Sequence, residues 1–218
     1  MTTSDNTTHA DRWCEFGTAA VSDALRNCGK SFQAMEAAIK PVAPEMKAAG
    51  PAFTVRCYPG ATWAMEQAFE LAQPGDVLVV DGGAAANVIL MGGLMSTRMQ
   101  QRGLAGAIVD GAVRDIDEII KLGFPVFSRH VCPNAGTFAE IGEWQTTVCC
   151  GRIPVNPGDW VVADRLGAVV VPQAIRDDVF LIAQTIDQRE KAMAKHLREG
   201  KTLSEAAAAA APSHEPNG

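Results

Sequence analysis

The chain has 218 residues, of which 47% are apolar and 20% charged, and this size suits one domain with a hydrophobic core of its own. Its 19 Lys and Arg residues against 25 Asp and Glu residues give a formal net charge of −6, and without a basic cluster a nucleic-acid partner is not expected. The longest apolar runs are only as long as a strand, whereas a membrane span needs about 20 apolar residues, so no membrane span is expected.

Residues 1–12 are polar and rich in Thr, Asp and Asn. We expect a disordered N-terminal arm there rather than a signal peptide, which would need an apolar core. None of the six cysteines forms a C-x-x-C pair. We therefore expect reduced thiols in a cytoplasmic protein.

The chain then alternates between helical and extended patterns. Helices are expected over Gly17–Cys28, Ala61–Ala72, Leu94–Arg102 and Ile116–Leu122. Strands are expected over Ala52–Cys57, Asp76–Asp81, Leu104–Asp110, Pro125–Phe127 and Gly167–Val171. Apolar strands that alternate with helices are typical of an α/β domain with a buried sheet.

The last part of the chain is expected to be helical. Arg176–Glu199 has the pattern of the longest helix, and Gly200 follows it as a C-terminal stop signal. Ala206–Ala211 is a run of six alanines before Pro212, which we expect to fray. No linker divides the chain, so we expect one α/β domain over residues 13–175, followed by a C-terminal helix and frayed tail over residues 176–218.

Several common catalytic motifs are absent from the sequence, including G-x-S-x-G, the Walker loop, H-E-x-x-H and G-x-G-x-x-G. The four histidines are scattered, which makes a His-rich metal site improbable. Only His130 stands at an expected strand end, beside Cys132 and Pro133. It either lines a pocket or belongs to an ordinary loop.

The region from Gly82 to Asp115 is the most informative. A Gly-rich stretch leads into a helix that starts near Gly92-Gly93-Leu94-Met95, where free backbone N–H groups would attract an anion. The alternative is that these glycines only allow close packing of helix and sheet.

The next expected strand, Leu104–Asp110, is followed by the run Asp110-Gly111-Ala112-Val113-Arg114-Asp115. Arg114 and Asp115 therefore stand between a strand and a helix, where sites in α/β folds usually lie. The alternatives are structural: Asp115 and Glu118 have the spacing of a capping box, and Arg114 could be an ordinary surface cation.

Together these segments resemble one family. Gly75–Asp81, the Gly92-Gly93-Leu94 helix start and above all Val109–Asp115 are similar to the class II pyruvate aldolases, which act on 4-hydroxy-4-methyl-2-oxoglutarate and 4-carboxy-4-hydroxy-2-oxoadipate. Thr18–Leu25 and Pro157–Pro172 fit the same family, whose RraA-like fold is shared with the protein regulator of ribonuclease E. The resemblance spans about residues 16–200. It implies an RraA-like three-layer β/β/α fold of the swivelling-domain type, with a C-terminal helical arm.

The resemblance also implies roles for particular residues. Gly92, Gly93, Leu94 and Met95 would cradle the carboxylate of the keto acid. Arg114 would bind the substrate's carboxylate or keto oxygen. Asp115 would hold a divalent metal, Mg²⁺ or Mn²⁺, directly or through water.

The implied reaction yields pyruvate enolate and a second keto acid. A hard cation polarises the keto oxygen as a Lewis acid, and Arg114 stabilises the enolate charge. Loss of CO₂ from oxaloacetate gives the same enolate, so oxaloacetate decarboxylation is an expected side activity. The lysines stand in polar or helix-end contexts, which disfavours a Schiff-base route.

Two other functions remain as alternatives. One is a non-catalytic protein-interaction regulator like the one that shares the fold. The other is a dedicated 2-oxo acid decarboxylase, which needs the same enolate site. Asp115, directly after the arginine, favours an enzyme over the regulator.

A further candidate lies in the C-terminal helix. Glu190 interrupts an apolar stripe formed by Val179, Ile182, Ile186, Met193 and Leu197. It either reaches solvent or is delivered to the site of a neighbouring subunit, where it would move a proton through a water molecule. The resemblance implies a homotrimer or homohexamer with active sites at subunit boundaries. The expected ligand is a small 2-oxo acid, with neither nucleic acid nor membrane as a partner.

Overall fold

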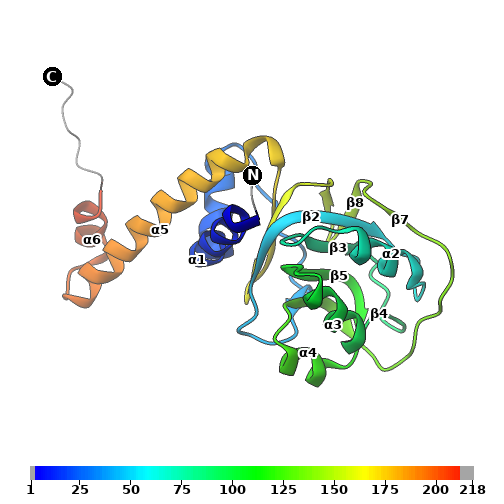
Figure 1. The fold of residues 1–218 in the computed structure, drawn as a ribbon. Helices are drawn as coiled ribbons and strands as arrows, with labels where there is room; N and C mark the ends of the chain where they lie inside the picture. Colours follow the sequence, from blue (N-terminus) through cyan, green and yellow to red (C-terminus); the bar gives the residue numbers. More distant parts are fainter. Residues whose placement is uncertain (1–2, 212–218) are drawn as a thin grey trace.

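The computed structural model describes residues 3–211, and Figure 1 shows the arrangement of its elements. The helices are α1 (Thr3–Asn27), α2 (Trp63–Leu71), α3 (Gly93–Gln101), α4 (Ile116–Leu122), α5 (Arg176–Arg198) and α6 (Leu203–Ala209), with a short 3₁₀ helix at Gln173–Ile175. The strands are β1 (Lys40–Pro41), β2 (Ala48–Arg56), β3 (Val77–Asp81), β4 (Ile89–Met91), β5 (Gly106–Val113), β6 (Val126–Val131), β7 (Glu143–Trp144), β8 (Val148–Cys150), β9 (Ile153–Val155), β10 (Trp160–Asp164) and β11 (Gly167–Val171). Within the described residues, no helix is both long enough and apolar enough to cross a membrane.

A parallel sheet forms the centre of the molecule. Strands β2, β3, β5 and β6 lie side by side in that order, and β4 pairs with the end of β5. Every residue of β5 is buried. A parallel strand covered on both faces is expected to be apolar throughout, and the Val- and Ala-rich sequence of β5 meets that requirement with Asp110 as its single charged residue.

Antiparallel strands extend this sheet until its ends approach each other. β10 and β11 continue the order beyond β2, and β1 lies beyond β6 at the opposite end. Lys40 Nζ in β1 donates to the carbonyl oxygen of Leu166, just before β11, at 2.6 Å. The Met35 N–H donates to the carbonyl oxygen of Ala168 at 2.8 Å. The sheet is therefore nearly closed.

Two hydrophobic cores lie on opposite faces of β10 and β11. Val161 and Ala163 of β10 point into the main core, which α2, α3 and α4 help to fill, whereas Trp160 and Val162 point into a second core. This alternation is the two-residue period of a strand. The second core is covered by α1 and α5, which pack against each other on that side of the molecule (Figure 1).

The expected α/β class is confirmed, and the C-terminal helix α5 projects from the body together with α6 (Figure 1). One difference concerns residues 3–12, which the structure assigns to α1 instead of a disordered arm. The physical reason is Trp13, which is fully buried with its ring centroid 5.9 Å from that of Trp160 and 5.1 Å from that of Phe180. Residues 1–2 lie outside the described part.

The alanine run also differs from the expectation. Its first four residues, Ala206–Ala209, belong to α6, and the last two follow the end of that helix. α6 begins at a capping box: Thr202 Oγ1 accepts a hydrogen bond from the Glu205 N–H, and the Glu205 side chain accepts one from the Thr202 N–H. Ala206 is fully buried. A cap and a buried contact stabilise a helix that its alanines alone would leave frayed. The rest of the expected frayed tail, residues 212–218, lies outside the described residues.

Candidate functional site

The candidate site lies where two neighbouring parallel strands end. Met91 at the end of β4 pairs with Val113 at the end of β5, and the Arg114 N–H donates to the carbonyl oxygen of Met91 at 3.2 Å. The residues that follow these strands, Gly92-Gly93 and Arg114-Asp115, are therefore neighbours in space although about twenty positions separate them in the sequence. The carboxyl ends of parallel strands are the usual position for ligand sites in α/β folds.

Asp115 connects the two segments directly. Its backbone is left-handed, with φ 57° and ψ 41°, a conformation that Asp and Asn adopt more readily than other side chains. Its Oδ2 accepts the backbone N–H of Gly93, at the start of α3, at 3.1 Å. It makes no side-chain cap on its own helix, α4. The capping-box alternative for Asp115 and Glu118 is therefore wrong.

The two glycines permit this close approach. A Cβ atom at Gly92 would lie 2.5 Å from Asp115 Oδ2 and 3.2 Å from Arg114 Cγ. A Cβ atom at Gly93 would overlap Glu118 Oε2. The glycines thus allow close packing, as the structural alternative held, and the groups that they admit are the charged side chains of the candidate site.

Arg114 presents a cation beside this carboxylate. Its Nε lies 3.5 Å from Asp115 Oδ2, is shielded from solvent and has no hydrogen-bond partner among the described residues. The side chain as a whole is 41% exposed. A buried donor without an acceptor is costly, so an anionic ligand bound at Arg114 would remove a cost that the free site carries.

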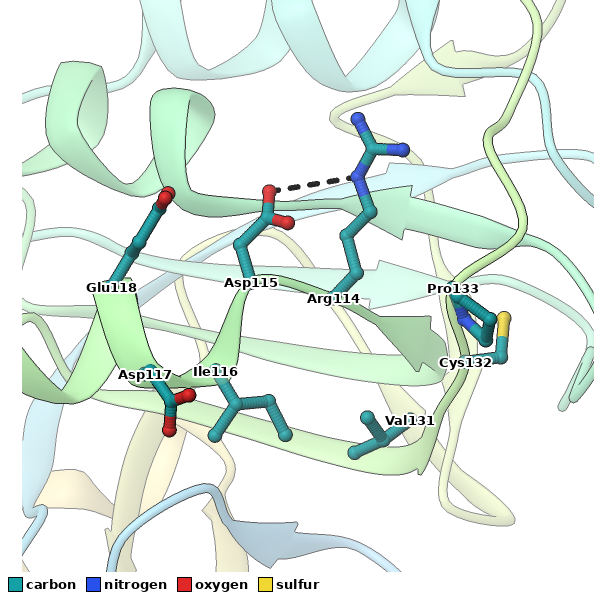
Figure 2. A pocket seen from close by; sticks show the side chains of 8 residues that line it. All are labelled: Arg114, Asp115, Ile116, Asp117, Glu118, Val131, Cys132 and Pro133. Atoms are coloured by element: carbon teal, nitrogen blue, oxygen red, sulfur yellow. Dashed lines mark ion pairs between the residues drawn. The ribbon is translucent and has the colours of Figure 1, made fainter.

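These residues open into a pocket of about 610 Å³ (Figure 2). Its wall consists of one cation, three carboxylates and four largely apolar side chains: Arg114, Asp115, Asp117, Glu118, Ile116, Val131, Cys132 and Pro133. His130 is not among the lining residues and lies within β6, where it pairs with Ala112, so the structure matches neither the pocket nor the loop alternative. Leu94, in the first turn of α3, is 86% exposed, whereas Met95 packs against the main core.

The carboxylates of this pocket are the groups that could hold a hard divalent cation. No group of three His, Cys, Asp or Glu side chains arranged to hold a metal occurs among residues 3–211, so a cation here would need water or ligand oxygens besides one or two carboxylates. Asp115 Oδ1 accepts no hydrogen bond from the described residues, and Asp117 and Glu118 line the same pocket. Mg²⁺ is commonly held by one or two carboxylates together with water and substrate oxygens.

Glu190 is not brought to this pocket within the chain. It is exposed on α5, which packs on α1 at the side of the molecule away from α3 and α4 (Figure 1). The apolar stripe of this helix is packed before Glu190 and exposed after it. Val179 is fully buried and Ile186 packs on the second core, but Leu197 is 41% exposed.

Asp110, the first residue of the segment that ends in Arg114-Asp115, supports the site and was not recognised as such from the sequence. Asp110 is 5% exposed. Its carboxylate accepts a hydrogen bond from Arg129 Nε at 2.5 Å and one from the Gly151 N–H at 2.7 Å. Arg129 also donates to Glu36 Oε2 at 2.8 Å, and the hydrogen bond with Asp110 raises the pKa of Arg129. A charged residue inside an apolar strand is the signal that could have identified this network, which fixes β5 four residues before Arg114.

Comparisons with known proteins agree with this arrangement. A family model described as Aldolase/RraA matches residues 18–170. A relative from Halalkalibacterium halodurans, named "Putative 4-hydroxy-4-methyl-2-oxoglutarate aldolase", is 33% identical over 162 residues, or 74% of this chain and 75% of the relative.

Solved structures show the same architecture. An uncharacterized protein from Pseudomonas syringae pv. tomato matches with a TM-score of 0.80 at 28% identity, over 93% of this chain and 94% of the other. The structure described as the "RNA-processing inhibitor RraA from Thermus thermophilis" matches with a TM-score of 0.64 at 26% identity, over 70% of this chain and 92% of its own.

Proposed function

Because the chain belongs to the Aldolase/RraA family, we propose that it is a lyase that breaks the C3–C4 bond of a 4-hydroxy-2-oxo acid and releases pyruvate and a second carbonyl compound. The acids implied by the sequence resemblance, 4-hydroxy-4-methyl-2-oxoglutarate and 4-carboxy-4-hydroxy-2-oxoadipate, belong to this class. Oxaloacetate decarboxylation is proposed as a side activity, since loss of CO₂ from C3 leaves the same pyruvate enolate.

The observation that carries the proposal is the Arg114–Asp115 pair at the end of β5, held against Gly92-Gly93 at the end of β4. A cation and a carboxylate that share a pocket offer two functions to a 2-oxo acid. The cation can bind an anionic oxygen, and the carboxylate can hold a metal. Neither function requires a nucleophile, and the pocket wall contains no lysine that could form a Schiff base with the substrate.

Arg114 is the group that we assign to the developing charge. When C3–C4 breaks, the electron pair of that bond passes to C3 and is delocalised onto the C2 oxygen, which becomes the enolate oxygen of pyruvate. A guanidinium is always charged and presents donors in a fixed plane, so it stabilises this oxygen without reorganisation during the reaction. The buried Nε would then gain the acceptor that it lacks in the free site.

Asp115 is the residue that would hold the divalent metal, Mg²⁺ or Mn²⁺, with water and substrate oxygens completing the coordination. When bound, such an ion acts as a Lewis acid on the keto oxygen. The Gly93 N–H orients the Asp115 carboxylate through Oδ2 and leaves Oδ1 without a protein partner among the described residues.

The proton transfers need a further group, because the pocket wall has no histidine. We propose that Glu190 of a neighbouring subunit takes the proton of the 4-hydroxyl group or returns one to C3, within a homotrimer or homohexamer. Glu190 is exposed on α5, a helix that projects from the body (Figure 1), and is therefore accessible to a second copy of the chain.

The non-catalytic alternative rests on the likeness to the RraA inhibitor structure, which covers 92% of that chain but only 70% of this one. A regulator acts through its surface and needs neither a buried guanidinium Nε without a hydrogen-bond partner nor a carboxylate in a strained backbone conformation. Such features cost stability and are typical of sites that act on a ligand. We therefore favour the enzyme.

The test is release of pyruvate, coupled to NADH oxidation by lactate dehydrogenase, from a set of 4-hydroxy-2-oxo acids and oxaloacetate, with Mg²⁺ or with a chelator. We expect at least one 4-hydroxy-2-oxo acid to be cleaved in the presence of Mg²⁺ and the activity to disappear with the chelator. Decarboxylation of oxaloacetate without cleavage of any 4-hydroxy-2-oxo acid would replace the aldolase by the dedicated decarboxylase. No pyruvate from any compound would contradict both enzymes.

A further inference from the structure

The middle of β5 contains a β-bulge. Val109 and Ala112 are three positions apart, but the residues of β6 that pair with them are only two positions apart. Asp110-Gly111 therefore lies opposite a single residue of β6, Arg129. An extra residue of this kind bends a strand and changes the direction of the side chains that follow, and such bulges are frequent beside active sites. This one lies four residues before Arg114.

The register after the bulge determines what surrounds Arg114. Val113 pairs with Val131, and the Cys132 N–H donates to the carbonyl oxygen of Val113 at 3.1 Å. Arg114 therefore follows β5 beside the end of β6, where Val131, Cys132 and Pro133 form part of the pocket wall (Figure 2). Without the extra residue, Val113 would pair with Cys132 instead, and the side chains of β5 would point to the opposite face of the sheet from there on.

One ion pair joins the two strands at the bulge, where the ladder of backbone hydrogen bonds is interrupted. Arg129 Nε donates to Asp110 Oδ1 at 2.5 Å, and the two side chains are only 10% and 8% exposed. Asp110 Oδ2 accepts a hydrogen bond from the Gly151 N–H at 2.7 Å. Because these groups are buried within one chain, their arrangement depends on neither the metal nor the neighbouring subunit of the proposed function.

The loop after β3 holds the bulge from its other side. The N–H groups of Gly82 and Ala84 both donate to the carbonyl oxygen of Asp110, at 3.1 Å each. A Cβ at Gly82 would lie 2.9 Å from that oxygen, so this approach requires a glycine. The backbone of Asp110 is thus fixed by the β3 side of the sheet, and its side chain is fixed by β6.

The ion pair is better suited to fixing a direction than to adding stability. Replacement of a buried ion pair by apolar groups of similar size is often neutral for stability. A guanidinium, however, presents its donors in a fixed plane, and two nitrogens of Arg129 bind carboxylates from two different segments, Asp110 and Glu36. The bulge is therefore held in one orientation relative to both segments.

We propose that Asp110 and Arg129 are positioning residues for Arg114: their ion pair holds the bulge of β5 and thereby aims the Arg114 guanidinium at the anionic oxygen of the ligand. The proposal rests on the role that the proposed function gives to Arg114. Neither Asp110 nor Arg129 lines the pocket, so both act through Arg114 and not on the ligand.

The proposal can be tested by binding of oxalate, a planar anion whose adjacent oxygens resemble those of pyruvate enolate. Its Kd for the full chain is measured by calorimetry in Mg²⁺. Asp110→Asn with Arg129→Met removes both charges together, so that no buried charge is left unpaired, and keeps an acceptor for the Gly151 N–H. We expect a folded protein that binds oxalate at least about fivefold more weakly, because the charged hydrogen bond from Arg114 is misdirected.

The same double change in an Arg114→Lys background separates aiming from general damage. The ammonium of a lysine is a point charge on a flexible stem and depends less on the direction of the strand. We therefore expect a further loss of oxalate affinity of less than about twofold in that background. A merely structural role of the ion pair would weaken binding by the same factor in both backgrounds.

Two further variants complete the comparison. Arg129→Lys keeps a cation beside Asp110 but loses the planar donors that reach Asp110 and Glu36 together, so its oxalate affinity should lie between those of the natural chain and of the double variant. The matched control is Glu70→Gln with Arg98→Met, which removes an ion pair between α2 and α3 and should leave the Kd as in the natural chain. Circular dichroism checks the fold of each variant.

Natural oxalate affinity in the folded Asp110→Asn/Arg129→Met variant would overturn the proposal, as would an equal loss in the Arg114→Lys background or no oxalate binding by the natural chain. If the double variant does not fold, Arg129→Lys decides, and natural affinity in that variant would overturn the proposal. The lyase function fails separately: the expected losses together with no pyruvate from any 4-hydroxy-2-oxo acid would support the positioning role and contradict the lyase function alone.

Discussion

At the scale of single residues, the site depends on Asp115 in a conformation that few side chains tolerate. A left-handed backbone costs about 1–2 kcal/mol for an L-residue, and the hydrogen bond from Gly93 N–H to Asp115 Oδ2 helps to offset that cost. Asn tolerates the same conformation. The charge of Asp115 can therefore be removed without removing the turn.

Arg114→Lys tests whether the guanidinium contacts the developing enolate. We expect kcat to fall by about 10- to 100-fold and KM to rise, since a point charge cannot reproduce the planar donors of Arg. Steady-state kinetics of pyruvate release measure both constants. An unchanged kcat with only KM altered would restrict Arg114 to binding the ground state.

The reactivity of the cysteines tests the description of the core. All six are free. Burial raises the pKa of Cys57 to about 12 and of Cys14 to about 11, and it raises that of Cys150 well above the ordinary value. Only thiolates react rapidly, so at pH 8 these three thiols stay protonated and should resist iodoacetamide, whereas exposed Cys149 should be labelled first. Mass spectrometry of the labelled chain, with and without urea, measures this; equal rates for Cys149 and Cys150 in the folded protein would contradict it.

At the scale of secondary-structure elements, the site needs β4 and α3 to lie against the turn after β5 without an intervening side chain. Gly92→Ala should therefore displace Asp115 and destabilise the fold by about 1–3 kcal/mol, the usual cost of overpacking. We also expect kcat/KM to fall at temperatures where the variant is still folded. Urea unfolding and pyruvate release measure the two effects.

Gly200→Ala is the control for that variant. Gly200, which follows α5, has a positive φ of 88°, whereas Gly92 has a φ of −149°, and a Cβ at Gly200 would meet nothing within 4 Å. We expect a loss of stability without a loss of activity in the folded protein. Full activity in Gly92→Ala would contradict the requirement for a glycine at that position.

The elements that the sequence predicts best are those with a complete local signal. The strand over Gly167–Val171 and the helix over Ile116–Leu122 are confirmed residue for residue, because each is an apolar pattern bounded by clear stop signals. β1 and β7 were missed because they are two-residue strands that exist through distant partners, such as Lys40 with Ser128 and Glu143 with Arg56. No local pattern encodes such pairing.

The same limit applies to the site. Arg114, Asp115 and Gly92-Gly93 were assigned to one site through the family resemblance, because no strand was expected before Gly92. The structure brings them together because β4 and β5 are parallel and end at one edge of the sheet. The apolar wall of the pocket could not be predicted from the sequence. Val131 reaches the pocket through its pairing with Val113, and neither strand's sequence alone determines the register of that pairing. The roles of these residues in catalysis stay predictions.

At the scale of the whole molecule, α5, which carries Glu190, lies away from α4, which contributes to the wall of the Arg114–Asp115 pocket (Figure 1). If Glu190 and this pocket serve one reaction, two copies must share each site. Mixing inactive Asp115→Asn subunits with inactive Glu190→Gln subunits should therefore restore activity, because some sites in the mixed oligomer receive an intact pocket from one subunit and an intact Glu190 from the other.

Subunits must be exchanged by mild unfolding and refolding, and the assembly of each variant checked by sedimentation. About a quarter of the sites should be fully intact in an equal mixture if subunits mix at random, which is the expected recovered activity. Mixed oligomers of normal size without any activity would contradict the shared site and leave Glu190 as a solvent-facing residue.

The central claim is that the Arg114–Asp115 pocket is the centre of a metal-dependent lyase, and Asp115→Asn tests it most directly. The measurement is the initial rate of pyruvate release from a cleaved 4-hydroxy-2-oxo acid as Mg²⁺ is varied, for the natural chain and for the variant, with circular dichroism and thermal unfolding as checks of the fold. We predict that the variant stays folded and that its Mg²⁺-dependent rate falls by at least about 100-fold, the scale of losing one preorganised electrostatic group. A folded variant with the Mg²⁺-dependent rate of the natural chain would contradict the claim.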